Sequence, residues 1–226
     1  MAKKATTRAT PNLILAQLST ADFALLEPHL KAADLPVRLQ LEDYGRLIRH
    51  AYFVERGIVS VVANGQGKRS IEVGIIGREG MTGFALIMGE ERATHESFVQ
   101  LAGSGQRITA AHLRMAIKAS VTLHAAFLRY GNTFVAQTAQ TALANGRSKI
   151  EQRLARWLLM AHDRIDGDDM LLTHEFLAVM LGVRRPGVTE ALNVLQDAGL
   201  IQSRRGTISI LDRAGLEKNS DGTYRP

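Results

Sequence analysis

The stretch THEFLAVMLGVRRPGVTEALNVLQDAGLI, residues 173–201, decides the fold of the C-terminal part of this chain. Thr173 is a suitable helix N-cap, and Glu175 follows it in the first turn, where the helix dipole favours negative charge. Gly182 can adopt the positive φ that a tight turn after a helix needs. Pro186 is tolerated only in the first turn of a helix, so a second helix begins just before it. The stretch therefore predicts two short helices around a glycine turn.

The second predicted helix has one apolar face and one exposed face. Its apolar residues recur at the i, i+3, i+4, i+7 spacing of a single helix face, and they are Val188, Ala191, Leu192 and Leu195. In a helix-turn-helix, the N-terminal residues of the second helix meet base edges, and arginine can pair with guanine through two hydrogen bonds. The candidate DNA contacts here are Thr173, Arg184, Arg185, Gly187, Thr189 and Glu190. Two amphipathic helices around a glycine also occur in proteins that never touch DNA, so this stretch alone leaves both interpretations open.

The sequence behind the second helix favours the DNA-binding interpretation. Residues 202–211, QSRRGTISIL, have the pattern of a β-hairpin with its turn at Arg205-Gly206. A helix-turn-helix followed by a hairpin is a winged helix. Arg204 and Arg205 would lie at the tip of the wing, where basic side chains contact DNA phosphates without reading the base sequence.

Composition excludes several classes of protein. The chain has 226 residues, 46% of them hydrophobic and 22% charged, which is ordinary for a globular protein of two domains. Because there is no cysteine, disulfides, thiolate-bound clusters and cysteine catalysis are excluded. The histidines form no His-x-x-x-His pair, and no nucleophile elbow or Walker loop is present, so we expect neither a metal site nor an enzyme. The apolar run at residues 13–18 is too short for a signal or membrane segment, which predicts a cytoplasmic protein without a membrane partner.

The N-terminal half has the pattern of a β-domain. After a flexible tail over residues 1–18, a short helix is predicted near residues 19–31, and short β-type runs with glycine turns follow. Turns are expected at Arg56-Gly57, which separates two strands, at residues 64–67, and at residues 103–105. Many short strands at close spacing indicate a β-sandwich or barrel over residues 19–120.

A long helix is predicted over residues 121–145. A heptad seam runs along it, made of Leu123, Phe127, Tyr130, Phe134, Gln137 and Thr141. Such a seam favours a partner helix from a second copy of the chain, and a helix packed on its own domain is the alternative. A further helix over residues 148–165, with Arg153 and Arg156 on its solvent side, would open the DNA-binding domain of residues 146–226. The polar tail after Asp212 is expected to lack structure.

From Leu18 to Leu211 this arrangement resembles the catabolite-activator and FNR-type transcription regulators. The resemblance implies an α+β fold with an N-terminal cyclic-nucleotide-binding-like β jelly roll, a long dimerisation helix and a C-terminal winged helix-turn-helix. It also implies a homodimer that binds an inverted repeat in double-stranded DNA, with RNA polymerase as a further partner if the protein is an activator. Arg185 matches the family's guanine-contacting arginine, whereas Pro186 and Glu190 replace its glutamate and arginine, so the known operator sequence is not expected.

The ligand signature of the family is altered in this chain. The resemblance implies a Gly-Glu pair for the nucleotide and an arginine for its phosphate, and here Gly83 is followed by Phe84, with the nearest arginine in Arg92-Ala93-Thr94. Phenylalanine cannot accept hydrogen bonds from ribose, which argues against cyclic AMP. No cofactor is required, and either an unidentified small-molecule effector or a purely structural jelly roll remains open. The alternative function is a small-molecule or cyclic-nucleotide sensor that acts through protein partners.

Overall fold

The computed structural model describes residues 10–65 and 70–225. The chain divides into two compact units, and each unit is built from two segments. The first unit comprises residues 1–61 and 76–135, and the second comprises residues 62–75 and 136–226. Within the described residues, no helix is long and apolar enough to cross a bilayer, and no group of three or more acidic, histidine or cysteine side chains could hold a metal ion.

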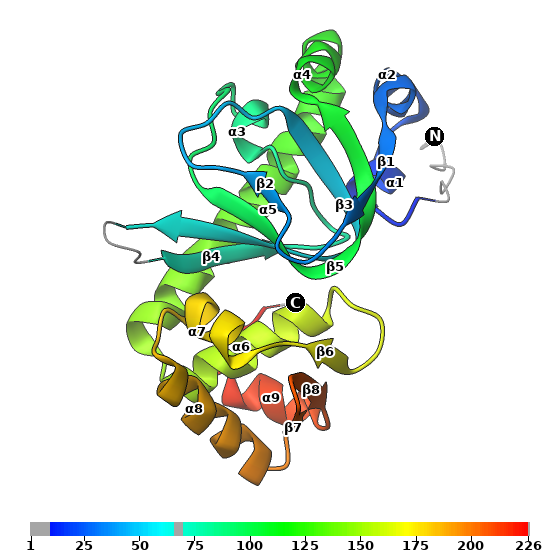
Figure 1. Ribbon diagram of the computed structural model, residues 1–226. Helices are drawn as coiled ribbons and strands as arrows, with labels where there is room; N and C mark the ends of the chain where they lie inside the picture. Colours follow the sequence, from blue (N-terminus) through cyan, green and yellow to red (C-terminus); the bar gives the residue numbers. More distant parts are fainter. Residues whose placement is uncertain (1–9, 66–69, 226) are drawn as a thin grey trace. The chain divides into compact units, whose positions relative to one another are not determined.

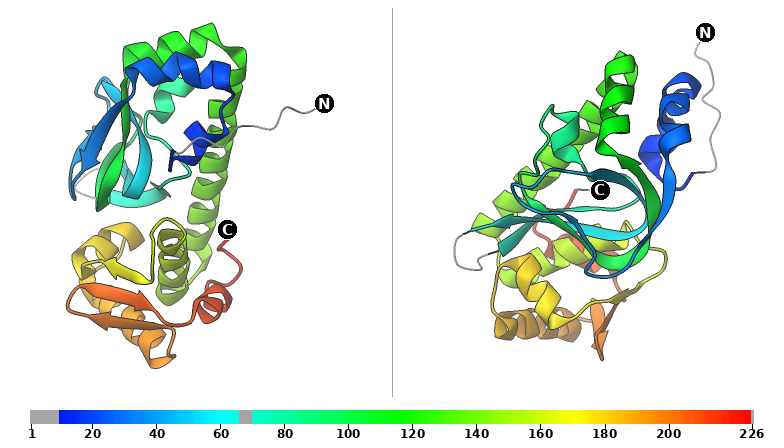
Figure 2. Two further views of the ribbon diagram at one scale, coloured as in Figure 1. Left: turned by 90° about the vertical axis from the view of Figure 1, so that its right-hand side faces the viewer. Right: turned by 45° about the horizontal axis from the view of Figure 1, so that its top comes forward.

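The elements of the first half and the long helix are α1 (Leu13–Gln17), α2 (Thr20–Leu26), the 3₁₀ helix η1 (Glu27–His29), β1 (Lys31–Leu35), β2 (Gln40–Glu42), β3 (His50–Asn64), β4 (Ser70–Ile76), α3 (Phe84–Ile87), β5 (Glu96–Thr109), α4 (Ala110–Ala119) and α5 (Val121–Arg147). The strands form one sheet in the order β1-β5-β3-β4, and β2 also pairs with β5 (Figure 1). Helix α2 packs beside α4 (Figure 2). The predicted α+β class is confirmed.

Two glycine turns predicted from the sequence lie inside long strands. Gly57 and Gly103 belong to β3 and β5, which run through these positions without a break. A Cβ on Gly103 would lie 1.9 Å from the carbonyl oxygen of Arg56, and one on Gly57 would lie 2.4 Å from that of Leu101. These glycines therefore allow two backbones to approach closely and do not reverse the chain. The predicted turn at residues 64–67 lies partly outside the described residues, since β3 ends at Asn64 and β4 begins at Ser70.

The segment just before α2 is also structured, although the sequence placed it in a flexible tail. Ile14 and Leu15 of α1 are buried in the hydrophobic core of the first unit. The amide of Asn12 is buried, and it donates to the carbonyl oxygens of Val54 and Gly80, each at 2.8 Å. Its side-chain oxygen also accepts from the Leu15 amide and so caps α1. Apolar burial and these hydrogen bonds fix this segment; residues 1–9 lie outside the described part of the chain.

The heptad seam predicted for dimerisation packs within the chain. Leu123 and Phe127 are fully buried in the core, and the hydroxyl of Tyr130 donates to the Met81 carbonyl oxygen at 2.9 Å. Phe134 is also buried, and the side chain of Gln137 bonds both backbone groups of Ile75, with its oxygen 2.7 Å from the amide nitrogen. Thr141, the last of the six, is half-buried and donates to the Gln137 carbonyl. The alternative interpretation, a helix packed on its own chain, therefore describes this face of α5.

A different face of α5 is exposed. Val121, Leu128 and Val135 are 85%, 40% and 54% exposed and lie seven residues apart. Ala125, Asn132 and Ala139 fall between them at the intervening heptad positions. Counting about 100° per residue, this stripe lies roughly 160° around the helix from the stripe that contains Leu123. The helix thus carries two apolar stripes of the same period, one covered by its own chain and one open.

The second unit contains the C-terminal elements, which are α6 (Ile150–His162), β6 (Asp169–Leu171), α7 (His174–Leu181), α8 (Arg185–Asp197), β7 (Ile201–Arg204), β8 (Thr207–Ile210) and α9 (Arg213–Asn219). Their strands form an antiparallel sheet in the order β6-β8-β7. The predicted solvent-facing position of Arg156 on α6 is wrong. Its side chain is buried, and its Nε donates to the Thr223 carbonyl oxygen at 3.0 Å. Burial lowers the pKa of Arg156 to about 10, but the guanidinium remains charged at neutral pH.

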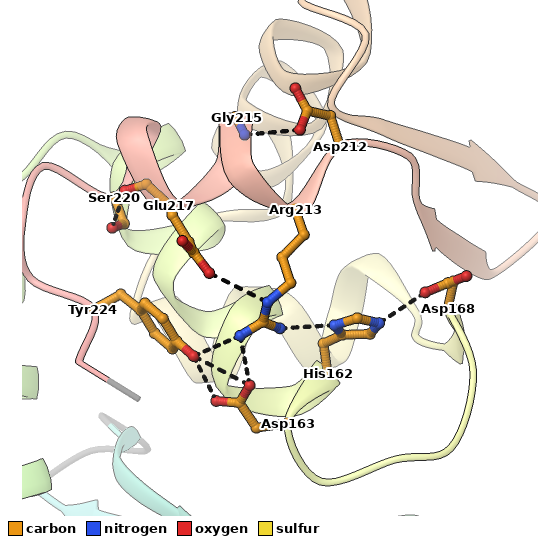
Figure 3. Close-up of polar contacts among 9 residues, drawn as sticks. All are labelled: His162, Asp163, Asp168, Asp212, Arg213, Gly215, Glu217, Ser220 and Tyr224. Atoms are coloured by element: carbon orange, nitrogen blue, oxygen red, sulfur yellow. Dashed lines mark hydrogen bonds and ion pairs between the residues drawn. The ribbon is translucent and has the colours of Figure 1, made fainter.

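The tail after Asp212, which was predicted to lack structure, is held by a polar network around Arg213 (Figure 3). The guanidinium of Arg213 bonds the Asp163 carboxylate at 2.8 Å and the Tyr224 hydroxyl at 2.7 Å. It also lies 2.8 Å from Nδ1 of His162, whose Nε2 is 2.8 Å from Asp168. Burial, together with the hydrogen bond to Asp163 and the charge of that carboxylate, raises the pKa of Tyr224 to about 12. These contacts join the end of α6 to α9 and the tail.

Candidate nucleic-acid interface

Helices α7 and α8 form the predicted pair around a glycine turn. The Thr173 hydroxyl accepts from the Phe176 amide at 3.2 Å and caps α7, and Gly182 ends α7 with a φ of 60°. Pro186 lies in the first turn of α8, where its missing amide leaves no helix hydrogen bond unmade. The predicted apolar face of α8 is buried, as shown by Val188, Ala191, Leu192 and Leu195. The predicted cap, turn and buried face are confirmed.

The exposed end of α8 carries the predicted contact residues. Arg184 stands at the N-cap without a side-chain cap bond, and Arg185 opens the helix. Both arginines are exposed, as are Thr189 and Glu190, and Gly187 is half-buried. The Thr189 hydroxyl bonds the Arg185 carbonyl and lies 3.1 Å from Nδ1 of His174. Arg184, Arg185 and Glu190 therefore offer long polar side chains at the helix start, while the hydroxyl of the exposed Thr189 already has partners within the protein.

The predicted hairpin is present as the wing. Strands β7 and β8 are joined at Arg205 and Gly206, whose φ angles of 47° and 84° match a tight hairpin turn of type I′. Arg204 and Arg205 are exposed at this turn. The third strand, β6, was not predicted, because three residues after an acidic loop give no alternating pattern to detect.

A groove of about 450 Å³ runs between the start of α7, α8 and the wing. It brings together Thr173, Arg185 and Arg205 from the predicted contacts and adds His174 and Asn193, which sequence reasoning did not select. Gln196 of α8 accepts from the Ser203 amide at 2.9 Å and so attaches the wing to the helix. The other five predicted contacts lie outside this groove, and they are Arg184, Gly187, Thr189, Glu190 and Arg204. Two cations from different elements therefore converge on one concave surface.

Arg153 of α6, which was predicted on the solvent side of its helix, is half-buried and supports this arrangement. Its guanidinium donates to the Leu181 carbonyl at the end of α7, where the last carbonyls of a helix lack partners within it. A cation at this end also interacts favourably with the helix dipole. Arg153 thus positions α7 without reaching the exposed face. Its spacing to Leu154 and Trp157 did not indicate this contact, because a solvent-exposed arginine on an amphipathic helix has the same spacing.

The predicted effector-pocket residues do not line one common cavity. The Gly83 amide donates to the Glu42 carboxylate at 2.7 Å, and Ser97 donates to the other oxygen of Glu42 at 3.0 Å. Phe84 packs on α5, with its ring 3.2 Å from a Cβ built on Gly131 and its centroid 5.6 Å from that of Phe134. The Gly83 amide is therefore bound by the protein itself. Of the remaining predicted residues, Arg92 and Ala93 line a separate cleft, and Thr94 is exposed outside it.

A family model described as the Crp-like helix-turn-helix domain matches residues 152–219, from α6 to the end of α9. The matched segment contains the helix pair, the wing and the groove between them. A search of curated proteins found no match. Residues 152–219 are a Crp-like helix-turn-helix domain.

Solved structures extend the likeness to the whole chain. A protein from Eubacterium rectale assigned to the CRP/FNR transcriptional regulators is 19% identical, with a TM-score of 0.73, covering 93% of this chain and 99% of its own. FixK2 from Bradyrhizobium japonicum is 16% identical, with a TM-score of 0.72, covering 84% and 96%. A CRP-family regulator from Thermus thermophilus is 19% identical, with a TM-score of 0.68 and the same coverage as FixK2. At these identities the solved structures show a shared fold, and the family model identifies the C-terminal domain within it. Over most of its length the chain shares the fold of these CRP/FNR-type regulators, and residues 152–219 belong to the Crp-like helix-turn-helix domains.

The buried carboxyl group of Glu42 is expected to make the stability of the folded protein depend on pH. Burial raises the pKa of Glu42, although hydrogen bonds from Ser97 and Gly83 act in the opposite direction. Because its pKa is raised in the folded state, the protonated form of Glu42 favours folding. This contribution to stability is complete below the unfolded-state pKa and is lost as pH rises through the folded-state pKa. Glu42→Gln keeps an acceptor for the Gly83 amide and removes this ionisation. We therefore expect the variant to lose less stability than the unchanged protein between about pH 4 and pH 8.

Urea unfolding across that pH range would measure the difference. Ser97 remains in both proteins and serves as a common hydrogen-bond partner. Parallel stability curves for the two proteins would show that Glu42 does not titrate differently on folding.

Proposed function

We propose that the chain is a homodimeric, sequence-specific DNA-binding regulator whose helix α8 enters the major groove of an inverted-repeat operator. The observation that carries this proposal is the convergence of Arg185, at the exposed start of α8, and Arg205, at the wing tip, on one groove. Base edges would meet Arg184, Arg185 and Glu190, and phosphates would meet Arg204 and Arg205. The regulator acts by binding DNA in the cytoplasm rather than by catalysis, with RNA polymerase as a further partner if it activates transcription.

The exposed stripe of α5 is the surface through which two copies would meet. Val121, Leu128 and Val135 repeat every seven residues, and small or polar residues occupy the positions between them. Apolar residues at such positions pack against the same residues of a second helix, and a polar residue such as Asn132 fixes the register. Two recognition helices related by twofold symmetry would then read half-sites roughly 34 Å apart.

The β-sheet domain of the first unit gives no support to cyclic AMP as the effector. Glu42 binds the Gly83 amide, and the aromatic ring of Phe84 packs against α5. A nucleotide bound at this pair would have to displace a buried carboxylate from two hydrogen bonds. We therefore propose that operator binding does not require cyclic AMP.

Selection of bound fragments from random DNA by the purified, ligand-free protein tests this function, with a second selection in the presence of cyclic AMP. We expect an inverted repeat with half-sites about one helical turn apart in both selections. A repeat recovered only with cyclic AMP would contradict the effector argument. Failure to enrich any sequence, or equal enrichment by a protein with Arg184, Arg185, Arg204 and Arg205 all changed to alanine, would contradict the proposed interface.

Two arginine variants separate base reading from phosphate binding. Arg185→Ala is expected to cost about 1–3 kcal/mol of binding free energy at one base-pair position and to relax specificity there. Arg204→Ala is expected to weaken binding to all sequences alike and to reduce the salt slope by about one. Binding titrations against an operator and its single-base variants at several salt concentrations would measure both effects.

Arg56→Ala is the matched control, since Arg56 is an exposed arginine of the first unit outside the groove. It should bind like the unchanged protein. The two roles would be reversed if Arg204→Ala altered preference at a single base position while Arg185→Ala changed only the salt dependence.

A further inference from the structure

His174, the first residue of α7, lines the groove of the candidate nucleic-acid interface and has no part in the function proposed so far. The imidazole is half-buried, and Arg185 of α8 and Arg205 of the wing tip line the same groove. None of the described residues that line the groove is acidic. Among them, His174 is the side chain that can change its charge between pH 5 and pH 8. Any effect of pH on this groove should therefore act through His174.

The hydrogen bonds of Thr189 decide which nitrogen of His174 carries the proton of the neutral ring. The Thr189 hydroxyl donates its single proton to the Arg185 carbonyl oxygen at 3.3 Å. The hydroxyl oxygen also lies 3.1 Å from Nδ1 of His174, and because its proton is already used it accepts there, so Nδ1 is the donor. In the neutral ring Nε2 then has no proton. Within the described residues Nε2 has no hydrogen-bond partner, so it is available to an incoming ligand.

A neutral His174 suits a DNA phosphate poorly. Phosphate oxygens accept hydrogen bonds, and an unprotonated Nε2 also accepts, so the two cannot bond each other. Protonation turns Nε2 into a charged donor, and charge-assisted hydrogen bonds to phosphate are stronger than neutral ones. A ligand that binds one protonation state more tightly also favours that state in the protein. DNA bound at Nε2 would therefore draw a proton onto the ring.

The charges around His174 change when DNA fills the groove. In the free protein Arg185 and Arg205 line the same surface and oppose a third positive charge there. Phosphates bound to these two arginines would compensate their charge and remove this opposition. The other charged residues of α7, α8, its N-cap and the wing lie outside the groove, and they are Glu175, Arg184, Glu190, Asp197 and Arg204. The groove thus favours the charged ring more strongly when DNA occupies it than when it is empty.

We propose that His174 binds a DNA phosphate in its protonated form, so that each subunit takes up a proton on operator binding and affinity rises as pH falls from 8 to 6. The proton moves from solvent to Nε2, while Nδ1 keeps its hydrogen bond to Thr189. Arg185 and Arg205 stay charged throughout this range. The inference rests on the proposed DNA-binding function and adds to it a dependence on pH.

Operator titrations of the full-length protein at pH 6 and pH 8, at constant ionic strength, test this proton uptake. We expect affinity to be about tenfold or more higher at the lower pH. Calorimetry at neutral pH in two buffers of different ionisation enthalpy should show net proton uptake on binding. Affinity that does not depend on pH, or binding without proton uptake, would overturn the inference and leave the DNA-binding function standing. Absence of operator binding at every pH would overturn both.

Two substitutions of His174 separate its charge from its shape. His174→Arg carries a permanent positive charge, so it should bind at pH 8 about as tightly as the unchanged protein binds at pH 6. His174→Gln cannot become charged, so it should bind weakly at both pH values. Both variants should lose the pH dependence and the proton uptake. His29→Gln, in the 3₁₀ helix of the first unit, is the matched control and should keep both.

The variants also separate His174 from the other histidines. Unchanged pH dependence in both His174 variants would assign the proton to another group and overturn the inference. Equal weakening by both variants at every pH would make His174 a neutral contact and would also contradict it. The proton count on the unchanged protein does not require either variant to fold.

Discussion

Changing Leu128 and Val135 of α5 together to aspartate is expected to convert the proposed homodimer into a monomer and to weaken operator binding by about 100-fold or more. Both residues lie on the exposed stripe, and in the proposed dimer their side chains would be buried against the same stripe of a second copy. Four buried carboxylates without partners, two from each copy, would cost far more than the apolar contacts of the stripe contribute. A monomer would then bind one half-site at a time and would lose the gain in affinity that comes from linking two recognition helices.

Sedimentation velocity and operator titration on the same samples would test this. Thr133→Asp is the control, because Thr133 is exposed on α5 but lies off the stripe. It should remain dimeric and bind normally. A double aspartate variant that still sediments as a dimer would place the dimer surface elsewhere, and a monomer with full operator affinity would show that dimerisation is not needed for binding.

Phe127→Ala is expected to lower the free energy of unfolding by about 3–5 kcal/mol, although Phe127 is the immediate neighbour of Leu128. Phe127 is fully buried, and its ring centroid lies 6.1 Å from that of Phe53 in the core of the first unit. Removing the ring forfeits its apolar burial and leaves a cavity that rigid strands cannot close. Oligomeric state should not change in the fraction that remains folded, because this face of α5 is covered by its own chain.

Urea unfolding measures the loss, with Arg129→Ala as a control on the exposed side of the same turn. The control should change stability by less than about 0.5 kcal/mol. A loss below about 1 kcal/mol for Phe127→Ala would mean that the core around β3 and α5 is packed differently.

The helix pair and the wing could be predicted because their signals are local. Thr173, Gly182 and Pro186 each act within one turn of chain, as a cap, a left-handed residue and a tolerated first-turn proline. Arg205 and Gly206 likewise form a turn between two short strands. Side chains held by distant segments were not predictable in this way. The helical pattern predicts a solvent-facing Arg156, whereas its guanidinium is buried against the carbonyl of Thr223.

The face of α5 was misassigned for a physical reason. Both stripes of the helix repeat every seven residues, and the aromatic one favours the interpretation of a partner interface. Only burial distinguishes them, and burial depends on strands far away in the sequence. Gly57 and Gly103 present the same difficulty, because a glycine that permits two strands to approach has the same local signature as one in a turn. No sequence pattern around Glu42 predicts its buried position, because its partner Gly83 lies about forty residues further along the chain.

The two stripes of α5 limit how this helix can change in length. Inserting one residue would rotate all that follows by about 100°, so that residues made for the core would face outward and those made for a partner would face inward. Inserting seven would keep both stripes aligned and add about 10.5 Å to the helix. Insertions and deletions in this helix should therefore be tolerated in steps of seven residues, and a library of α5 length variants selected for folded, DNA-binding protein should recover lengths at that spacing.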